Sequence, residues 1–457
     1  MVNPPYAIHA AESRALWLST AAYTVSFAAW TLFSIIGVQI ERELGLTGTE
    51  FGLLVAMPML VGSVARVLLG VAVERYAVRF VFAGVMIVGA VSTFLLSFAA
   101  TYPLMLVAAF ALGIVGGAFV TAVAHVSQWY PTERQSRAFD VLGIGIAGAA
   151  VTHVFAPALL VAHGWRVVAQ IWAVGLLATA AFLWFALREH VDGAARGTRA
   201  DSLEAPLSRL APLKNVQVWR FALYYFFVFG AFVALVLWLP RYVMDVYRLD
   251  IETAGAIAAI FSLPAGLCRF YGGALVRDYG ARRLMYWTLS VAVACTFVLS
   301  YPAADYVMTG ARGPIAFHAE IGVVAFTAAI LVLGAFMSFG QAAVFEHIPV
   351  YYPKHVAVVG GLVGMIGGLG GFALPIAFGI LADLSGVRQS CFMLLFALVS
   401  AALIWMHIAI RHMEREKAGA ALGTLPELPE MEEIHHSEHE GALGPRALRP
   451  HPPINRN

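Results

Sequence analysis

The sequence predicts an all-α membrane protein whose twelve transmembrane helices form two pseudo-symmetric six-helix halves. Three observations predict this fold: 60% of the 457 residues are hydrophobic and only 12% charged, apolar runs recur along the chain, and motifs of the first half return in the second. The mean hydropathy is +0.79, whereas a water-soluble domain would carry about 25% charged residues. The composition therefore excludes a soluble globular protein.

Twelve apolar runs are long enough to cross a bilayer, which takes about 20 residues. They cover approximately residues 16–40, 51–74, 79–100, 104–129, 136–162, 166–187, 217–246, 253–277, 284–302, 317–348, 355–382 and 388–410. These spans give an N-terminal half at 1–187, a cytoplasmic linker at 188–216, a C-terminal half at 217–411 and a tail at 412–457. The first run is too long for the apolar core of a signal peptide, so we expect it to be a true helix.

Lys and Arg are distributed unevenly over the loops, and the richer side is expected to face the cytoplasm. The richer side carries Arg14, Arg75, Arg79, Arg134, Arg137, Arg188, Arg196, Arg199, Arg209, Lys214, Arg220, Arg277, Arg282, Arg283, Lys354, Arg411, Arg415 and Lys417. The poorer side carries Arg42, Arg166, Arg241, Arg248, Arg312 and Arg388. We therefore expect a multi-pass protein of the cell inner membrane with both termini in the cytoplasm.

The remaining composition argues against metals, cofactors and nucleic acid. The tail is rich in Pro, Glu and His, which favours disorder; its His435, His436 and His439 could bind a metal, but a solvated tail is the expected state. The three cysteines lie in apolar stretches, which favours packing over a disulfide or zinc framework. A net charge of +2 without a basic block gives no reason to expect a nucleic-acid partner.

The two halves repeat one another at two offsets. Arg66, Gly70 and Arg79 recur 203 residues later as Arg269, Gly273 and Arg282. A second series recurs at an offset of 222 residues and pairs His125 with His347, Gly145 with Gly367, and Gly148 with Gly370. Duplicated six-helix halves are typical of secondary transporters, whose substrate site lies between the halves near the middle of the membrane.

Arg66 and Arg269 are the strongest candidates for a substrate site. Both lie well inside their predicted spans, where an arginine costs about 2.5 to 3.5 kcal/mol and normally faces the bundle interior. Apart from Glu346, the sequence indicates no carboxylate at a similar depth. Two repeat-related guanidiniums without carboxylate partners predict an anion site, and their forked donors suit a planar oxyanion.

Glycines gather on two helices, with Gly145 and Gly148 on the fifth span and Gly367 and Gly368 on the eleventh. Spacings of three and four residues place small side chains on one face, so neighbouring backbones can approach closely. Alone, this pattern indicates only close packing. Together with the arginines it predicts a narrow path for a small substrate.

Three stretches carry family motifs: residues 129–135 read WYPTERQ, residues 145–157 read GIAGAAVTHVFAP, and residues 360–375 read GGLVGMIGGLGGFALP. They resemble the nitrate/nitrite porter family of the major facilitator superfamily. The resemblance implies glycine-rich nitrate signatures on helices five and eleven and substrate arginines on helices two and eight, which match Arg66 and Arg269. The segment 223–240 resembles the proton-linked nitrate importers more than the nitrate/nitrite exchangers.

Two departures from the family pattern affect these expectations. Ile146 stands where the helix-five signature usually has Asn, which bears on substrate identity, and His153 stands where members often carry Gln. The acidic-then-basic loop order survives as Glu74 and Arg75 but is reversed as Arg277 and Asp278, which bears on gating.

The remaining polar residues can be interpreted as packing residues or as functional ones. His153 is either a packing histidine or a proton carrier and substrate donor, because imidazole titrates near neutrality. Tyr225 could donate to a small anion, although aromatic packing is the default. His125, His347 and Glu346 lie near the cytoplasmic ends of their spans, where we expect a gating role.

The sequence therefore predicts a monomeric transporter that imports nitrate by alternating access with proton symport. The alternatives are a nitrate/nitrite antiporter, a porter of a related small anion, and a transporter-like membrane sensor. The partners expected are nitrate, nitrite, protons and the lipid bilayer. No nucleophile, metal cluster or pair of carboxylates is visible at membrane depth, so we do not expect an enzyme.

Overall fold

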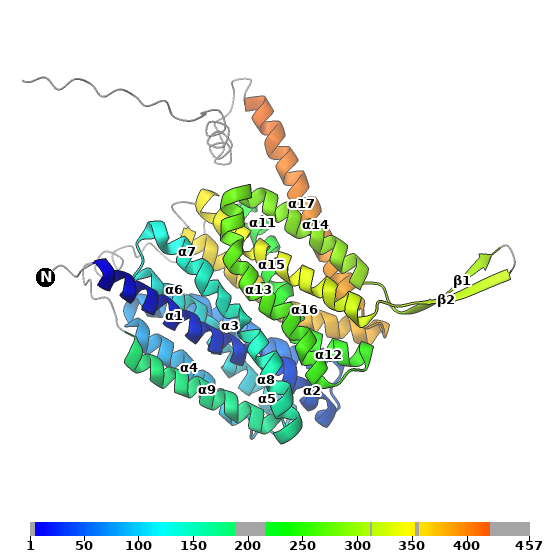
Figure 1. Cartoon of the computed structure of the whole chain (residues 1–457), viewed down its shortest axis with the longest axis horizontal. Helices are drawn as coiled ribbons and strands as arrows, with labels where there is room; N and C mark the ends of the chain where they lie inside the picture. The colour runs from blue at the N-terminus through cyan, green and yellow to red at the C-terminus, as the bar shows by residue number, and fades with distance from the viewer. Residues whose placement is uncertain (1–4, 188–214, 311–312, 352–355, 421–457) are drawn as a thin grey trace, which may run out of the picture.

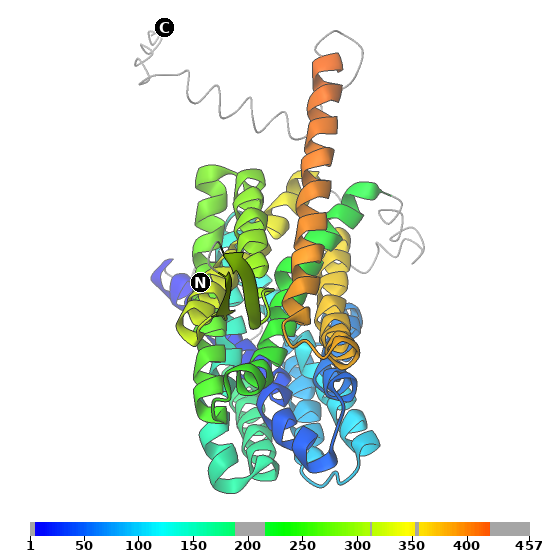
Figure 2. The same cartoon turned by 90° about the vertical axis from the view of Figure 1, so that its right-hand side faces the viewer.

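The computed structural model describes residues 5–187, 215–310, 313–351 and 356–420. Most of the predicted linker and most of the predicted tail, including His435, His436 and His439, lie outside these residues. The last helix continues past the predicted boundary at residue 411 to Ala420, and Figure 2 shows it extending beyond the rest of the bundle.

The N-terminal half is built from helical segments that run back and forth across the molecule (Figure 1). They are α1 (Pro5–Trp30), α2 (Phe33–Leu44), α3 (Gly48–Arg75), α4 (Val78–Leu96), α5 (Tyr102–Leu112), η1 (Gly113–Gly117), α6 (Ala118–Ser127), α7 (Thr132–Gly143), η2 (Ile144–Ala147), α8 (Gly148–His163) and α9 (Trp165–Ala186).

The C-terminal half repeats this arrangement and adds a two-stranded hairpin. Its elements are α11 (Val216–Tyr225), η4 (Phe226–Ala231), α12 (Phe232–Tyr247), α13 (Ile251–Tyr279), α14 (Ala281–Leu299), β1 (Ala304–Gly310), β2 (Gly313–Ala319), α15 (Val323–Tyr351), α16 (Val356–Ser385) and α17 (Ser390–Ala420).

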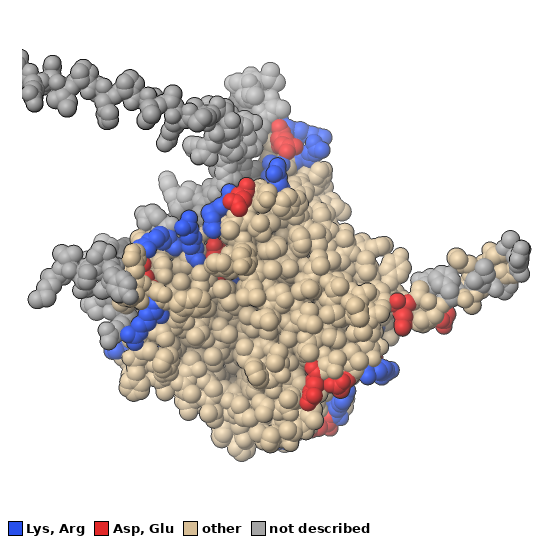
Figure 3. All heavy atoms as spheres, viewed as in Figure 1, with Lys and Arg blue, Asp and Glu red and all other residues tan. Residues whose placement is uncertain are grey.

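Eleven helical segments of the described chain are long and apolar enough to span a membrane. The twelfth crossing is α14, which is helical but carries Arg282 and Arg283 in its first turn. Because successive crossings alternate in direction, α1 begins and α17 ends at the same end of the bundle. We name this the terminal end, and the opposite end, where the hairpin leaves the bundle, the hairpin end. Figure 3 shows Lys and Arg gathered mainly along the terminal end.

The hairpin corrects one predicted span. The tenth span was expected to begin at residue 317, but residues 313–319 form β2, which pairs antiparallel with β1. Gly310 and Gly313 permit the tight connection, and Pro314 disfavours a helix there. On β2, hydrogen bonds to Asp305 and then to Glu320 raise the pKa of His318.

Three helices have local breaks, and one of these breaks, η2, contacts α13 of the opposite half. The segments η1 and η2 are short 3-10 helices and η4 is a π-helical turn; such irregular turns interrupt regular packing and are frequent at functional sites. The halves contact each other through two equivalent pairs, α3 with α16 and α13 with α7, η2 and α8. These contacts bring the second and eighth helices, which carry the two arginines, against the glycine-rich helices of the opposite half.

Candidate functional site

Arg66 and Arg269 converge from the two halves. Arg66 on α3 donates from Nη1 to the carbonyl oxygen of Gly364 on α16, 3.1 Å away. Arg269 on α13 lies against Gly143 of α7, where a Cβ atom would overlap its side chain. Each arginine thus rests on the glycine-containing helix of the opposite half, and the two charges lie close enough to act on each other.

Both guanidiniums are held without a carboxylate. None of the ion pairs among the described residues includes Arg66 or Arg269. Arg269 donates from Nη1 to Oε1 of Gln341 at 2.5 Å, and Arg66 stacks over the rings of Trp30 and Phe229, 5.8 and 5.2 Å from their centroids. The Nε atom of Arg66 is buried without a hydrogen-bond partner in the described part of the chain. Such an unsatisfied donor can accommodate an anion.

Two tyrosines, Tyr23 and Tyr225, each occupy space left by a glycine. A Cβ atom at Gly145 would overlap the ring of Tyr23, and one at Gly367 would overlap the ring of Tyr225. The ring of Tyr225 also stacks on the ring of Phe229, over which the guanidinium of Arg66 lies. Close packing explains these glycines, and a role of Tyr225 in binding the anion stays a prediction.

The other two predicted glycines pack without tyrosines. Gly148 lies against the backbone of α1 at Thr24, and Gly368 lies against the hydroxyl of Ser63. They set the distance between helices.

Sequence analysis missed Tyr23 and Gln341. Tyr23 lies 202 residues before Tyr225, one residue out of register with the 203-residue offset of the arginines, so the repeat offsets did not point to it. Gln341 is fully buried and bridges Arg269 to the carbonyl oxygen of Val228 through its Nε2 donor, 2.9 Å away. A glutamine in the middle of a predicted span was the available signal for this residue.

His153 lies in the interface between the halves, and its hydrogen bonds are separate from those of the two arginines. Its Nδ1 is 3.3 Å from the hydroxyl of Ser262, and its Nε2 is 3.2 Å from the hydroxyl of Ser34 and 3.1 Å from the carbonyl oxygen of Val236. The side chain is fully buried. His153 therefore ties both halves together, and its role in substrate or proton binding stays a prediction.

The terminal end is closed by polar contacts between the halves. Ser136 on α7 donates to Oε1 of Glu346 at 2.7 Å. Asp140 lies 3.7 Å from Nη1 of Arg277 and fits against Gly273, where a Cβ atom would overlap its carboxylate. Sequence analysis overlooked Asp140 as a carboxylate within its span. Its charge interacts with those of Glu346 and Arg269. These contacts join α7 to α13 and α15.

The other predicted gating residues have different surroundings. Arg277 pairs with Asp140, which makes it a contact between the halves. His125 contacts Ser19 within the N-terminal half at 2.8 Å, and His347 packs on Phe221 within the C-terminal half. Arg75 is exposed at the end of α3. The side chain of Glu74 lies outside the described part of the structure.

Polar contacts between the halves also close the hairpin end, and sequence analysis did not find them. We call these contacts the lock. Arg241 on α12 forms a forked pair with Glu41 on α2, with Nη2 to Oε1 at 2.6 Å and Nε to Oε2 at 2.8 Å. The side chains are only 6% and 16% exposed. Asp383 on α16 accepts from the backbone N–H groups of Gly48 and Thr49 at 2.9 and 2.8 Å, at the start of α3. A carboxylate at a helix N-terminus is favourable, so both contacts hold the halves together at this end.

Weakening this lock should open the hairpin end. Glu41→Gln keeps one hydrogen bond but removes the charge, which should cost about 1 kcal/mol and raise the open fraction roughly fivefold. Met59 is buried on α3 beside Gly371 of α16. The substitution Met59→Cys, made after the native cysteines are replaced by serine, provides a thiol that reports on opening. A membrane-impermeant maleimide added from the hairpin end should label it several times faster in Glu41→Gln.

The control is Glu43→Gln, because Glu43 contacts Arg166 within the N-terminal half at 3.8 Å with both side chains well exposed. It should leave labelling unchanged. Equal labelling rates in the two variants would show that the Glu41–Arg241 pair does not hold this end closed.

Comparison with known proteins decides the family. The Major Facilitator Superfamily matches residues 19–323. The chain belongs to this superfamily. It is 39% identical to the probable nitrate/nitrite antiporter NarK1 of Thermus thermophilus, covering 89% of this chain and 93% of the relative. It is 29% identical to the nitrite extrusion protein of Bacillus subtilis (strain 168), covering 88% and 96%. These relatives confirm the predicted nitrate/nitrite porter family.

Solved structures of transporters share the fold. A bacterial homologue of the human lysosomal transporter Spinster, inward-facing and occupied, matches with a TM-score of 0.66 and 16% identity over 87% of this chain and 97% of its own. A mutant of the nucleoside transporter NupG matches with a TM-score of 0.66 and 13% identity, over 86% and 99%. The prediction of a multi-pass transporter, and not an enzyme, is confirmed.

Proposed function

We propose that this chain exchanges nitrate for nitrite through one anion site between Arg66 and Arg269. The observation that carries the proposal is the convergence of two guanidiniums from opposite halves, with no carboxylate paired to either in the described residues. Both anions are small, planar and monovalent, and forked N–H donors fit their oxygens. The names of the relatives support these substrates.

Alternating access follows from how the arginines are held. Each guanidinium rests on the opposite half, so an anion bound between them contacts both halves at once. Without the anion, two like charges face each other in a poorly hydrated site and repel. The empty site should therefore resist the transition, which favours exchange because each direction of travel needs a bound anion.

Exchange also removes the need for a proton carrier. Nitrate is an anion at physiological pH, so proton-driven import into a negative cell requires more than one proton per nitrate. His153, the carrier proposed from the sequence, is enclosed by contacts with Ser34, Ser262 and Val236. Exchange of one monovalent anion for another moves no net charge.

Proton-linked import remains the second candidate because Asp140 lies one helical turn after Ser136, which donates to Glu346 across the halves. Two neighbouring carboxylates can share a proton. We further propose that a monomer is the transporting unit and that the terminal end faces the cytoplasm, as the distribution of Lys and Arg favours.

Counterflow in liposomes tests the exchange. Purified protein should take up labelled nitrate when the lumen contains nitrite, and should show little uptake into an anion-free lumen even with an inward proton gradient. Liposomes without protein provide the background. Proton-driven uptake into a nitrite-free lumen would reject exchange in favour of symport, and Asp140→Asn and His153→Gln would then identify the carrier. No uptake under any condition would favour the sensor alternative.

A further inference from the structure

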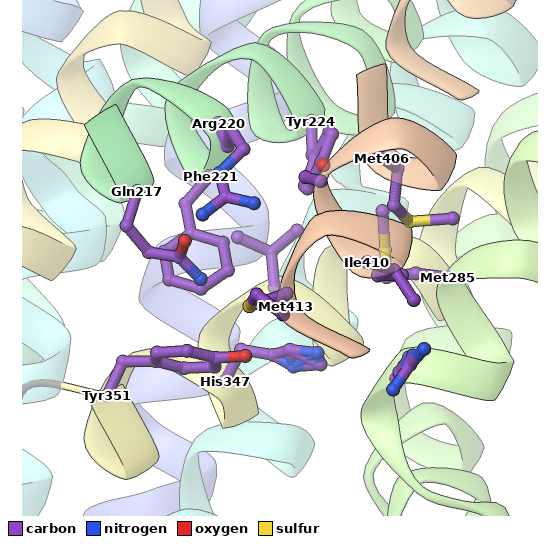
Figure 4. Close-up of a pocket in the computed structure, with 13 residues that line it drawn as sticks. Gln217, Arg220, Phe221, Tyr224, Met285, His347, Tyr351, Met406, Ile410 and Met413 are labelled. Atoms are coloured by element: carbon purple, nitrogen blue, oxygen red, sulfur yellow. The ribbon is translucent and has the colours of Figure 1, made fainter. Parts of the chain in front are cut away.

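A pocket separate from the anion site opens at the terminal end of the C-terminal half. Four helices enclose it, namely α11, α14, α15 and α17. Its enclosed space is only about 30 Å³, and the empty space rises to about 440 Å³ when the open mouth is included. Much of its wall is apolar, with Phe221, Met285, Met406, Ile410 and Met413 around the hollow (Figure 4). Methionine walls adapt to irregular apolar ligands.

One cation in this pocket lacks a matching anion. Figure 4 shows the guanidinium of Arg220 directed into the hollow, and its Nε atom is buried without a hydrogen-bond partner in the described part of the chain. Arg282, also in the wall, is already paired with Glu414 at 2.7 Å. The described lining includes no Asp or Glu. The pocket therefore combines an apolar wall with an uncompensated positive charge.

The pocket lies beside surface that suits lipid. Trp219, next to Arg220 on α11, is 48% exposed, and Ile404 and Ile408 on α17 are 59% and 61% exposed. Met406, Ile410 and Met413 of the same helix face inward. An amphiphile could thus keep its acyl chains along this apolar surface while its phosphate reaches the guanidinium of Arg220 from the mouth of the pocket.

We propose that this pocket binds the headgroup of an anionic phospholipid, with its phosphate on Arg220. Basic pockets between transmembrane helices are suited to such headgroups. Tyr224 lines the pocket, and the next residue, Tyr225, lies at the anion site on the same helix. Lipid occupancy is therefore placed to affect transport, although the binding site itself does not depend on the proposed exchange.

Native mass spectrometry of the full chain released from nanodiscs tests the site. With equal amounts of phosphatidylcholine and phosphatidylglycerol, the wild type should retain a phosphatidylglycerol molecule that Arg220→Gln loses. Removing one cationic contact of about 1 kcal/mol corresponds to roughly fivefold weaker retention. Arg220→Lys should restore most of it, because the charge remains. The control Arg283→Gln removes an exposed arginine of α14 outside the pocket and should retain the lipid.

Several results would overturn the proposal. Equal retention in Arg220→Gln and wild type would exclude Arg220 as the contact, and equal retention of phosphatidylcholine would exclude a site for anionic lipid. Displacement of phosphatidylglycerol by inorganic phosphate would show a site for soluble anions instead. Unfolding temperatures in neutral detergent should match among the variants; a lower value for Arg220→Gln alone would assign the arginine a structural role.

Discussion

Arg269→Lys should lose most anion transport while the protein remains folded in the membrane. Lysine keeps the positive charge but lacks the fork that allows Arg269 to bind Gln341 and an anion together. Each hydrogen bond to a charged group contributes about 1.5 to 3 kcal/mol, so the loss of one predicts a reduction in apparent affinity of roughly tenfold to a hundredfold. Nitrate uptake over a range of concentrations in nitrite-loaded liposomes measures this effect.

The matched change is Arg66→Lys, which removes the contact with Gly364 and the planar stacking on Trp30 and Phe229. It should lower uptake to a similar degree, because the two arginines have equivalent positions in the repeat. Arg283→Gln, an exposed change away from the site, controls for general effects of losing a guanidinium. Near-normal uptake by either lysine variant would show that a point charge is sufficient and that the fork is not needed.

The arginines were predictable because burying an arginine is costly and the repeat places two of them at one depth. Tyr225 was predictable only as a candidate, since nothing in its own sequence context separates a substrate contact from a packing ring. The structure packs the ring of Tyr225 against Gly367 and Phe229, and a substrate contact stays a prediction. Tyr23 has the same relation to Gly145, but it lies one residue out of register with the offset of 203, so the repeat did not point to it.

The closures at both ends could not be read from the sequence. Glu41 and Arg241 lie 200 residues apart at the ends of predicted helices, where an exposed charge is the default expectation. Asp140 was overlooked within its span, and only the packing of α7 on α13 shows that Gly273 admits its carboxylate between the halves. Such contacts depend on how two independently predictable halves meet, which no local pattern encodes.

The fold was predictable from apolar runs. The start of the tenth span was predicted wrongly, again because it depends on a contact between separate segments. Residues 317–319 are apolar or weakly polar and adjoin a long apolar run, so a hydropathy window extends the helix over them. Pairing with β1 supplies their backbone hydrogen bonds instead. Strand pairing is a contact with a distant segment, and hydropathy does not record it.

Three substitutions on α16 should separate packing from transport. Gly370→Ala places Cβ 2.9 Å from the Cα of Gly230 and 2.9 Å from the carbonyl oxygen of Phe226. Since backbone atoms must move, this overpacking should cost about 1 to 3 kcal/mol and lower the unfolding temperature. In Gly367→Ala the three atoms nearest to the new Cβ atom all belong to the ring of Tyr225 and none to the backbone, so this variant should lose transport with less loss of stability. Uptake and thermal unfolding are measured together.

Gly361→Ala is the control on the same helix, because a Cβ atom there meets nothing within 4 Å. It should transport normally and be as stable as the wild type or slightly more so, by up to about 1 kcal/mol, since alanine loses less backbone freedom than glycine in a helix. If all three variants behaved alike, the glycines would act only through helix propensity. A loss of transport confined to Gly367→Ala and Gly370→Ala would instead show that the halves need backbone contact on one part of α16 and a correctly placed tyrosine ring on another.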